Sequence, residues 1–146
     1  MPADAPALAD LHAEGGFSHA WSVSEFEELL ADRAVETEIL CDSKHTERLF
    51  GFSMSRVAAD EAEILTIVVS QARRGEGLGR RLLDAQMARL AARGVTVLYL
   101  EVEETNRAAR ALYERAHFDV AGERRGYYRK ADGQVATALI MKRALA

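Results

Sequence analysis

The chain has 146 residues and a net charge of -4, with 49% hydrophobic and 29% charged residues, a balance typical of one folded domain and unlike a disordered chain. The negative charge argues against broad nucleic-acid binding, and the single cysteine, Cys41, excludes an internal disulfide. No stretch is apolar for long enough to span a membrane. We therefore expect one cytoplasmic domain over residues 1–146, with no membrane, nucleic-acid or metal partner, and we expect Cys41 to be a small apolar filler.

The first half of the chain predicts two helices followed by three strands. Leu8 and Leu11 lie at helical spacing within residues 4–13, and Ser22 and Glu25 have the spacing of a capping box at the start of a second helix. Apolar and β-branched runs then predict strands. The expected strands cover residues 37–41, 49–57 and 63–69, and the first two form a hairpin.

The second half predicts two helices and three further strands. Leu83, Met87 and Leu90 mark the buried stripe of a long helix, which Gly94 ends. The remaining elements are a strand at 95–102, a helix at 106–116 and strands at 118–121 and 136–141. This order predicts a mixed α/β sheet with helices on both faces.

The segment between the third strand and the long helix carries the strongest functional signal. It reads RRGEGLGRRLL over residues 73–83. Its glycines at 75, 77 and 79 allow successive backbone N–H groups to converge on an anion, and the helix N-terminus adds roughly half a positive charge. Four arginines strengthen this positive field. The segment therefore predicts a phosphate-binding loop.

Spacing separates the phosphate motifs that compete for this loop. A P-loop requires Lys and then Ser or Thr after its last glycine, but Gly79 is followed by two arginines. A dinucleotide fingerprint requires glycine at Arg80, although Glu101 lies near the distance of a ribose-binding carboxylate. An ordinary glycine-rich turn with solvated arginines also fits. The remaining pattern, Arg74-x-x-Gly77-x-Gly79, resembles the pyrophosphate loop of the GCN5-related N-acetyltransferases (GNAT), which bind acetyl-coenzyme A.

A second group of polar residues follows the next strand. Glu101 lies at the end of that strand, and Asn106 and Tyr113 are seven residues apart on the following helix, so both point from one face. Acyl transfer from a thioester to an amine needs a base for the amine proton and an acid for the departing thiolate, and a carboxylate and a phenol suit these tasks. Each residue alone also fits a structural role, as a solvated Glu, a helix cap and a half-buried Tyr.

Longer motifs make the resemblance specific. The run Leu100-Glu101-Val102 followed by Asn106, Ala109 and Leu112-Tyr113-Glu114 is similar to that of bacterial ribosomal-protein-alanine N-terminal acetyltransferases, as are Trp21-Ser22 and the hairpin of Arg124-Arg125-x-Tyr127-Tyr128. The resemblance implies a GNAT-like mixed, mostly antiparallel central sheet with helices on both faces. The family begins with a strand, whereas this sequence enters a helix almost at once. We therefore expect that first strand to be absent and the exposed sheet edge to permit dimerisation.

The resemblance also implies a role for each matching residue. Glu101 would be the general base and Tyr113 the general acid, while the backbone N–H of Val69 would donate to the thioester oxygen. His117, where the family tends to place glycine, is read as a structural left-handed cap. The implied acceptor-binding residues are Trp21, Tyr127 and Tyr128. The implied cofactor contacts are Ile67, Val68, Val69, Arg74, Gly75, Glu76, Gly77, Leu78, Gly79 and Asn106, with acetyl-CoA as cosubstrate and no metal.

The chemistry of amines narrows the acceptor. An α-amine has a pKa of about 8 against about 10.4 for lysine, so far more of it is neutral and reactive at neutral pH. The sequence thus predicts N-terminal acetylation of a protein, with the N-terminal alanine of a ribosomal protein implied by the family. The alternatives are an acetyltransferase for a small amine or a peptide lysine, and a coenzyme-A-binding regulatory module without turnover. The basic hairpin residues Arg124, Arg125, Arg129 and Lys130 are expected to form a solvated face with no catalytic role.

Overall fold

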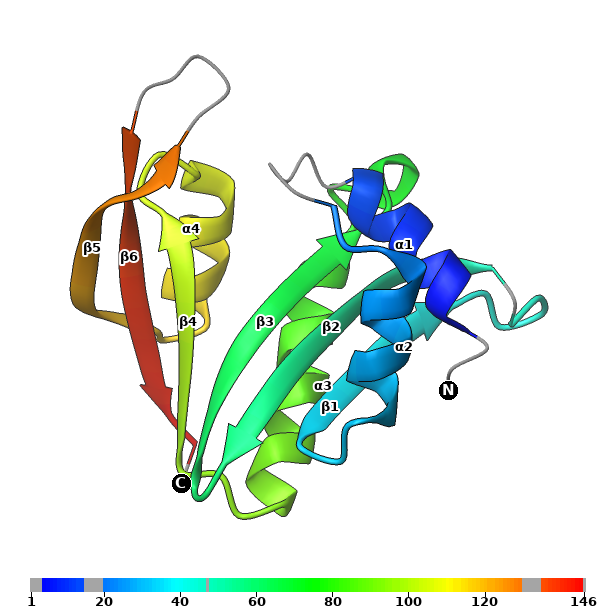
Figure 1. The fold of residues 1–146 in the computed structure, drawn as a ribbon, viewed down its shortest axis with the longest axis horizontal. Helices are drawn as coiled ribbons and strands as arrows, with labels where there is room; N and C mark the ends of the chain where they lie inside the picture. Colours follow the sequence, from blue (N-terminus) through cyan, green and yellow to red (C-terminus); the bar gives the residue numbers. More distant parts are fainter. Residues whose placement is uncertain (1–3, 15–19, 47, 130–134, 146) are drawn as a thin grey trace.

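The computed structural model describes residues 4–14, 20–46, 48–129 and 135–145, with side chains for all of these except 126–129, 135 and 136. Figure 1 shows a twisted sheet with helices on both faces. In chain order the elements are α1 (Ala5–Glu14), α2 (Val23–Ala31), β1 (Val35–Cys41), β2 (Leu49–Ala58), β3 (Glu61–Val69), a 3-10 turn η2 (Gln71–Arg73), α3 (Leu78–Ala92), β4 (Val97–Glu103), α4 (Arg107–Arg115), β5 (Asp119–Arg129) and β6 (Val135–Ala144).

The six strands form one sheet in the order β1-β2-β3-β4-β6-β5, which confirms the predicted mixed, mostly antiparallel architecture. All neighbouring pairs are antiparallel except β3 and β4. These two strands pair only from Glu61–Glu63 to Val97–Tyr99. Beyond that point they diverge, as Figure 1 shows, and the sheet opens between them.

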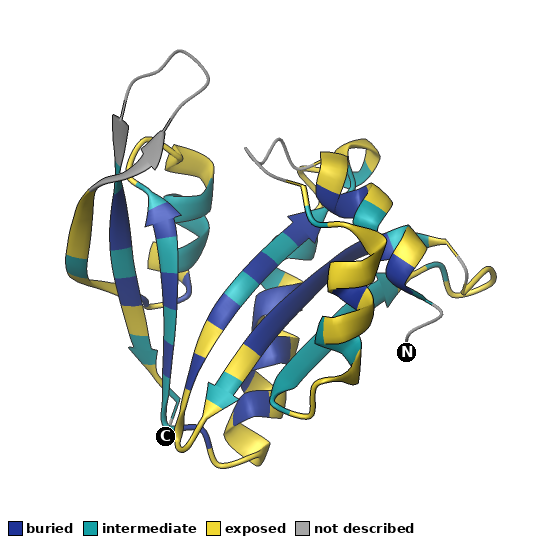
Figure 2. Cartoon of the chain, viewed as in Figure 1, coloured by how far each residue is buried: buried dark blue, intermediate teal, exposed yellow. Residues whose placement is uncertain are grey.

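The core has two parts, one on each face of the sheet. Phe26 of α2 and Leu8 of α1 pack with Phe52 against one face, whereas Leu83 and Leu90 of α3 pack against the other. Strand β2 lies between the two layers, and residues 51–55 are buried without alternation (Figure 2). A strand that is covered on both faces must exclude water from every side chain, so β2 is the centre of the α1/α2/α3 half of the fold.

A β-bulge in the β2–β3 pair changes which side chains face which layer. Met54 lies opposite Thr66 and Ser55 opposite Ile64, so Leu65 has no partner in the register. Because side chains alternate along a strand, one extra residue reverses the pattern. Ile64 accordingly packs on the α3 side, whereas Val68 packs on the α1/α2 side.

The helix ends follow their predicted chemistry. Ser22 caps α2 through a complete capping box with Glu25. Asn106 caps α4, because its side-chain oxygen accepts the N–H of Ala109 at 3.1 Å. His117, with a φ of 69°, takes the left-handed conformation directly after that helix, as predicted.

Several boundaries and one environment differ from the sequence prediction. Strands β5 and β6 extend well beyond the predicted 118–121 and 136–141, because β5 pairs with β6 through polar residues and the end of β6 pairs with β4 as far as Ala144. Such residues on an outer strand carry no apolar alternation to reveal the strand. Cys41 is exposed at the end of β1, so its prediction as an apolar filler was wrong.

Gly51 on β2 permits the close approach of β3. A Cβ at this position would lie 2.8 Å from the carbonyl oxygen of Val68 and 3.1 Å from a methyl carbon of Leu82. We expect Gly51→Ala to lower the free energy of unfolding by about 1–3 kcal/mol, because neither the backbone of β3 nor buried Leu82 has room to move. Chemical denaturation checks this value. Gly122→Ala is the matched control, since its nearest contact would be an ordinary 3.8 Å to Ile140; equal losses in both variants would contradict the steric argument.

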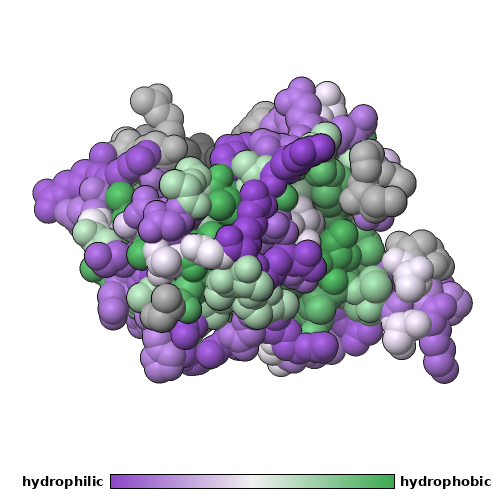
Figure 3. Space-filling view, turned by 90° about the horizontal axis from the view of Figure 1, so that it is seen from below, coloured by the Kyte–Doolittle hydropathy of each residue, from purple (hydrophilic) through white to green (hydrophobic). Residues whose placement is uncertain are grey.

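The edge and surface of the molecule bear on the predicted partners. Within the described residues, strand β1 pairs with β2 alone, and the first element of the chain is α1. On the face seen in Figure 3, hydrophobic patches are separated by hydrophilic side chains. None of the helices in the described ranges is both long and apolar enough to cross a membrane. Self-association through the sheet edge and a cytoplasmic location stay predictions.

Candidate functional site

The glycine-rich loop joins β3 to α3 through η2. Gly75 and Gly77 have φ values of 84° and 76°, which side-chain-bearing residues rarely adopt, and Gly77 is the N-cap of α3. A Cβ at either position would meet nothing within 4 Å, so backbone conformation rather than space requires glycine there. The N–H groups of the first helical turn have no acceptor within the helix. The loop and helix end therefore present an anion-binding surface.

The four arginines around this loop are not equivalent. Arg73 pairs with Glu76 at 3.1 Å and lies over the ring of Phe50, and Arg80 pairs with Asp84 at 2.9 Å. Within the part of the chain that the structure describes, no ion pair is formed by Arg74 or Arg81. These two guanidinium groups are the ones available to an incoming phosphate.

The end of β3 offers unpaired backbone groups. The N–H of Ser70 donates to the carbonyl of Phe50 on β2 at 2.7 Å. Because backbone groups alternate in direction along a strand, the N–H groups of Val69 and Ile67 point away from β2. They point toward β4, whose pairing with β3 has already ended at Glu63. The predicted residues 67–69 thus form a free strand edge beside the opening of the sheet.

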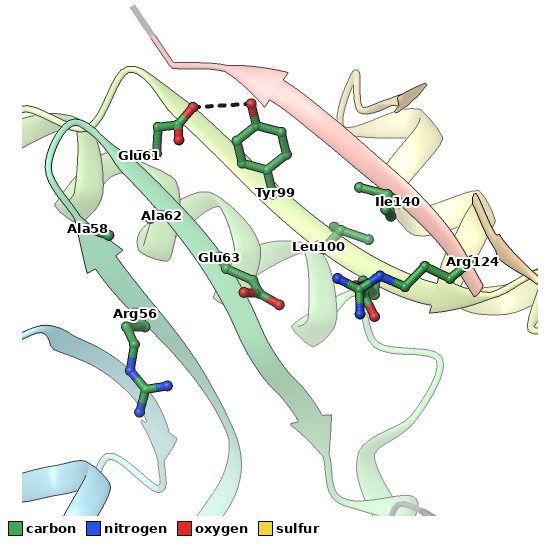
Figure 4. Close-up of a pocket in the computed structure, with 10 residues that line it drawn as sticks. Arg56, Ala58, Glu61, Ala62, Glu63, Tyr99, Leu100, Arg124 and Ile140 are labelled. Carbon is green, nitrogen blue, oxygen red and sulfur yellow. Dashed lines mark hydrogen bonds and ion pairs between the residues drawn. The ribbon is translucent and has the colours of Figure 1, made fainter. Parts of the chain in front are cut away.

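A cavity of about 320 Å³ lies on the α1/α2 face next to this opening. Figure 4 shows side chains from several strands converging on it, with Glu63 pointing into it between Arg56 and Arg124. The hydroxyl of Tyr99 donates to Glu61 at 3.2 Å, and this bond and the carboxylate charge raise the pKa of Tyr99. The cavity is lined by Arg56, Ala58, Glu61, Ala62, Glu63, Tyr99, Leu100, Glu101, Arg124 and Ile140.

Glu101 is the predicted catalytic residue in this cavity, and it has an ion-pair partner that sequence reasoning missed. Arg124 on β5 reaches across β6 and places its Nε 3.2 Å from Oε1 of Glu101. The arginine side chain is 52% exposed and the glutamate 17%, so the pair is open to the cavity. The expectation of a purely solvated hairpin face was therefore wrong for Arg124. The sequence alone does not reveal the strand register that brings the two residues together. Strand β6 lies between them, with Ile140 opposite Glu101 and Ala138 opposite Arg124.

Tyr113 lies on the other face of the sheet from Glu101. It packs with the α3/α4 side of the core, and its ring makes an edge contact with Phe118 at 5.8 Å between centroids. Burial raises the pKa of Tyr113 to about 12, so the phenol keeps its proton at neutral pH. Glu101 and Tyr113 therefore do not share the cavity but lie on opposite faces of β4, close to the point where β4 separates from β3. Asn106 is exposed at the helix start and is engaged as the cap.

A second cavity, of about 380 Å³, adjoins the first through their common residue Arg56. Trp21, which was predicted to bind the acceptor, forms one wall. Buried His12 fixes this wall, because its Nδ1 accepts the backbone N–H of Trp21 at 3.2 Å and its ring stacks on the indole at 4.6 Å. The cavity is lined by Trp21, Glu25, Glu28, Leu29, Asp32, Arg56 and Leu65. The predicted Tyr127 and Tyr128 lie in β5, but their side chains fall outside the described part of the chain.

Comparison of the sequence with known proteins identifies one matching family. The Acetyltransferase (GNAT) family model matches residues 6–118. The ribosomal protein bS18-alanine N-acetyltransferase of Escherichia coli (strain K12) is 36% identical over 114 residues, which cover 78% of this chain and 74% of the relative.

Solved structures agree with the sequence match. The crystal structure of the ribosomal-protein-S18-alanine N-acetyltransferase from Escherichia coli superposes with a TM-score of 0.88 and 32% identity, covering 99% of this chain and 89% of the other. Arabidopsis thaliana NAA60 in complex with acetyl-CoA has the same fold, with a TM-score of 0.83, 20% identity and coverage of 98% and 94%.

Proposed function

Because this chain belongs to the GNAT family of acetyltransferases, we propose that it transfers the acetyl group of acetyl-CoA to the α-amine at the N-terminus of a protein. The observation that carries the proposal is the position of Glu101, in a carboxylate-lined cavity directly beside the opening between β3 and β4. The bS18-alanine N-acetyltransferase relatives indicate the N-terminal alanine of a ribosomal protein as the first-choice acceptor. Such an acceptor implies action in the cytoplasm.

The residues around the opening fit acetyl-CoA, which supplies an activated acetyl thioester. Residues 74–79 would hold the pyrophosphate through backbone N–H groups and the guanidinium of Arg74. The free edge at Ile67 and Val69 would pair with the pantetheine amides in the manner of an added strand. Asn106 uses only its side-chain oxygen as the cap, so its amide N–H groups could also contact the pantetheine.

Glu101 and Tyr113 would divide the proton transfers between the two faces of the sheet. Glu101 would take a proton from the acceptor amine, which enters from the cavity. Val69 would stabilise the negative oxygen of the tetrahedral intermediate through its backbone N–H. Tyr113 would donate its proton to the departing sulfur on the other face, since burial keeps its phenol protonated. The attacking amine displaces the thiol directly, so no covalent intermediate on the enzyme is needed.

The charge of the acceptor path supports an amine substrate. Among the residues whose side chains the structure describes, the two adjoining cavities are lined by six carboxylates and two guanidinium groups, those of Arg56 and Arg124. An acceptor arrives largely as an ammonium ion at neutral pH, and cavities lined by one sign of charge concentrate ions of the opposite sign. The acceptor would therefore enter past Trp21 toward Glu101.

Intact-mass detection of acetyl transfer tests the proposal. Two peptides are mixed in one tube with acetyl-CoA, one with a free N-terminal alanine and no lysine, the other N-terminally blocked with one lysine. A mass gain on the alanine peptide alone is the expected result. A gain on the lysine peptide alone would replace the α-amine specificity with lysine acetylation. No gain on either, with acetyl-CoA binding demonstrated, would favour a small-amine enzyme or a non-catalytic coenzyme-A-binding module.

Arg74 gives a prediction for cofactor binding alone. We expect Arg74→Gln to raise the KM for acetyl-CoA about ten-fold with little change in kcat, because one charge-assisted phosphate contact is lost far from the reacting atoms. Steady-state kinetics at saturating acceptor measure this change. Arg73→Gln is the matched control, since Arg73 is already paired with Glu76, and its KM should rise less. A larger effect at Arg73 would contradict the assignment.

A further inference from the structure

Resting on the proposed function, we infer that Arg124 is a specificity-determining residue that binds the carbonyl oxygen of the acceptor's first residue, and so selects an α-amine over a lysine ε-amine. The premise is the contact between Arg124 Nε and Glu101 Oε1 at 3.2 Å, within the cavity that the acceptor amine must enter. An amine that reaches Glu101 therefore arrives beside this guanidinium.

The carboxylates of the cavity do not distinguish one primary amine from another. Glu61, Glu63 and Glu101 all attract an ammonium ion, whether it belongs to a chain terminus or to a lysine side chain. Discrimination must come from a group that contacts what lies next to the nitrogen. In a peptide terminus this neighbour is a carbonyl oxygen roughly 3 Å from the nitrogen, since only the Cα and the carbonyl carbon separate them. In lysine it is a run of methylene groups.

Arg124 has the chemistry and position to detect that oxygen. A planar guanidinium carries several N–H donors in a fixed fork and can hold a carboxylate and a carbonyl oxygen at the same time. The other guanidinium of the cavity, that of Arg56, lies on the opposite side in Figure 4, toward β2. Methylene groups of a lysine at Glu101 would cover Arg124 without offering it an acceptor, which disfavours that substrate.

The exposure of the ion pair allows this exchange. Arg124 is about half exposed, and ion pairs of this kind contribute little to stability. An incoming ammonium can therefore share the carboxylate of Glu101 while the guanidinium turns toward the carbonyl oxygen. Loss of Arg124 should leave the fold intact for the same reason.

The test compares two small acceptors that differ only beside the amine. Alaninamide and isopropylamine both carry the amine on a methyl-bearing carbon, but only alaninamide has a carbonyl oxygen. We expect Arg124→Gln to lower kcat/KM for alaninamide about ten-fold, mainly through KM, and to leave isopropylamine unchanged. The basicity of the two amines differs, but each amine is compared with itself between enzymes. Arg124→Lys should recover part of the loss, because it restores the charge without the fork.

Arg125→Gln is the matched control. Arg125 is the next residue on β5 and also forms an ion pair, with Glu123 at 2.8 Å, but it is 85% exposed and does not line the cavity. Arg125→Gln should leave kcat/KM unchanged for both alaninamide and isopropylamine. Equal losses for both amines in Arg124→Gln would overturn the inference, because Arg124 would then act only through Glu101. The inference would also be overturned if Arg124→Gln kept the wild-type kcat/KM for alaninamide. If the wild-type enzyme acetylates only the lysine peptide of the experiment above, the proposed function itself fails.

Discussion

Tyr113→Phe is expected to reduce kcat about a hundred-fold while the KM for acetyl-CoA changes little, because the variant removes one proton donor and no binding contact. Phenylalanine keeps the edge contact with Phe118 and the packing against the α3/α4 side of the core. The variant should therefore unfold at nearly the wild-type temperature. Steady-state kinetics with thermal unfolding as the folding control measure both expectations.

The departing thiol makes this prediction specific to acid catalysis. A thioester of a more acidic thiol needs less help in leaving, so the defect of Tyr113→Phe should shrink with such an acetyl donor. A defect of the same size with both donors would remove Tyr113 from the role of acid. An equal loss in turnover and cofactor affinity would instead assign it to binding.

The pH dependence of Tyr113 follows from its burial. Its pKa is raised to about 12, so the phenol stays protonated where an exposed tyrosine, with a pKa of about 10, would begin to ionise. Activity should therefore not decline around pH 10 because of this residue. Folding stability does depend on this residue at higher pH, because the buried phenol must stay neutral. Its contribution to the free energy of unfolding is fully present below about pH 10 and is lost as the pH rises toward 12. A pH–rate profile of the wild type and Tyr113→Phe checks the first statement.

Glu101→Gln is the second substitution with a large expected effect. We expect kcat near neutral pH to fall about a hundred-fold, because glutamine keeps the shape of the side chain but accepts no proton from the amine. The defect should diminish as the pH rises past the amine pKa of about 8, since the acceptor then arrives already deprotonated. Kinetics from pH 6.5 to 9.5 at saturating acetyl-CoA measure this change.

The ion pair with Arg124 requires a control for this variant. Glutamine can still accept a hydrogen bond from Arg124, so Glu101→Gln retains most of the local geometry. The recovery of kcat with rising pH should appear in Glu101→Gln. It should be absent in Arg124→Gln, which is expected to raise the KM for the acceptor instead. An unchanged rate in Glu101→Gln would exclude Glu101 as the base. A defect that is constant with pH would indicate a role in orientation instead.

Much of the fold could be predicted from local patterns in the sequence. The capping box of Ser22 and Glu25 and the left-handed conformation at His117 occur where expected, and Asn106 caps α4, which the sequence left as the alternative to a cofactor contact. Each depends on residues within a few positions along the chain, so the nearest neighbours decide the outcome. The ends of β5 and β6 were not predictable in this way, because pairing with neighbouring strands rather than their own composition extends them.

By itself, the sequence determined the glycine-rich loop at a helix N-terminus and the placement of Glu101 and Tyr113 on consecutive elements, because glycine conformations and helical or strand periodicity are local properties. Only the tertiary structure decided that the two residues lie on opposite faces of β4 and that Arg124 contacts Glu101. The contact between Arg124 and Glu101 depends on the register of β4, β6 and β5. Register between strands distant in sequence is set by the packing of both sheet faces, where a shift of one residue reverses every side chain.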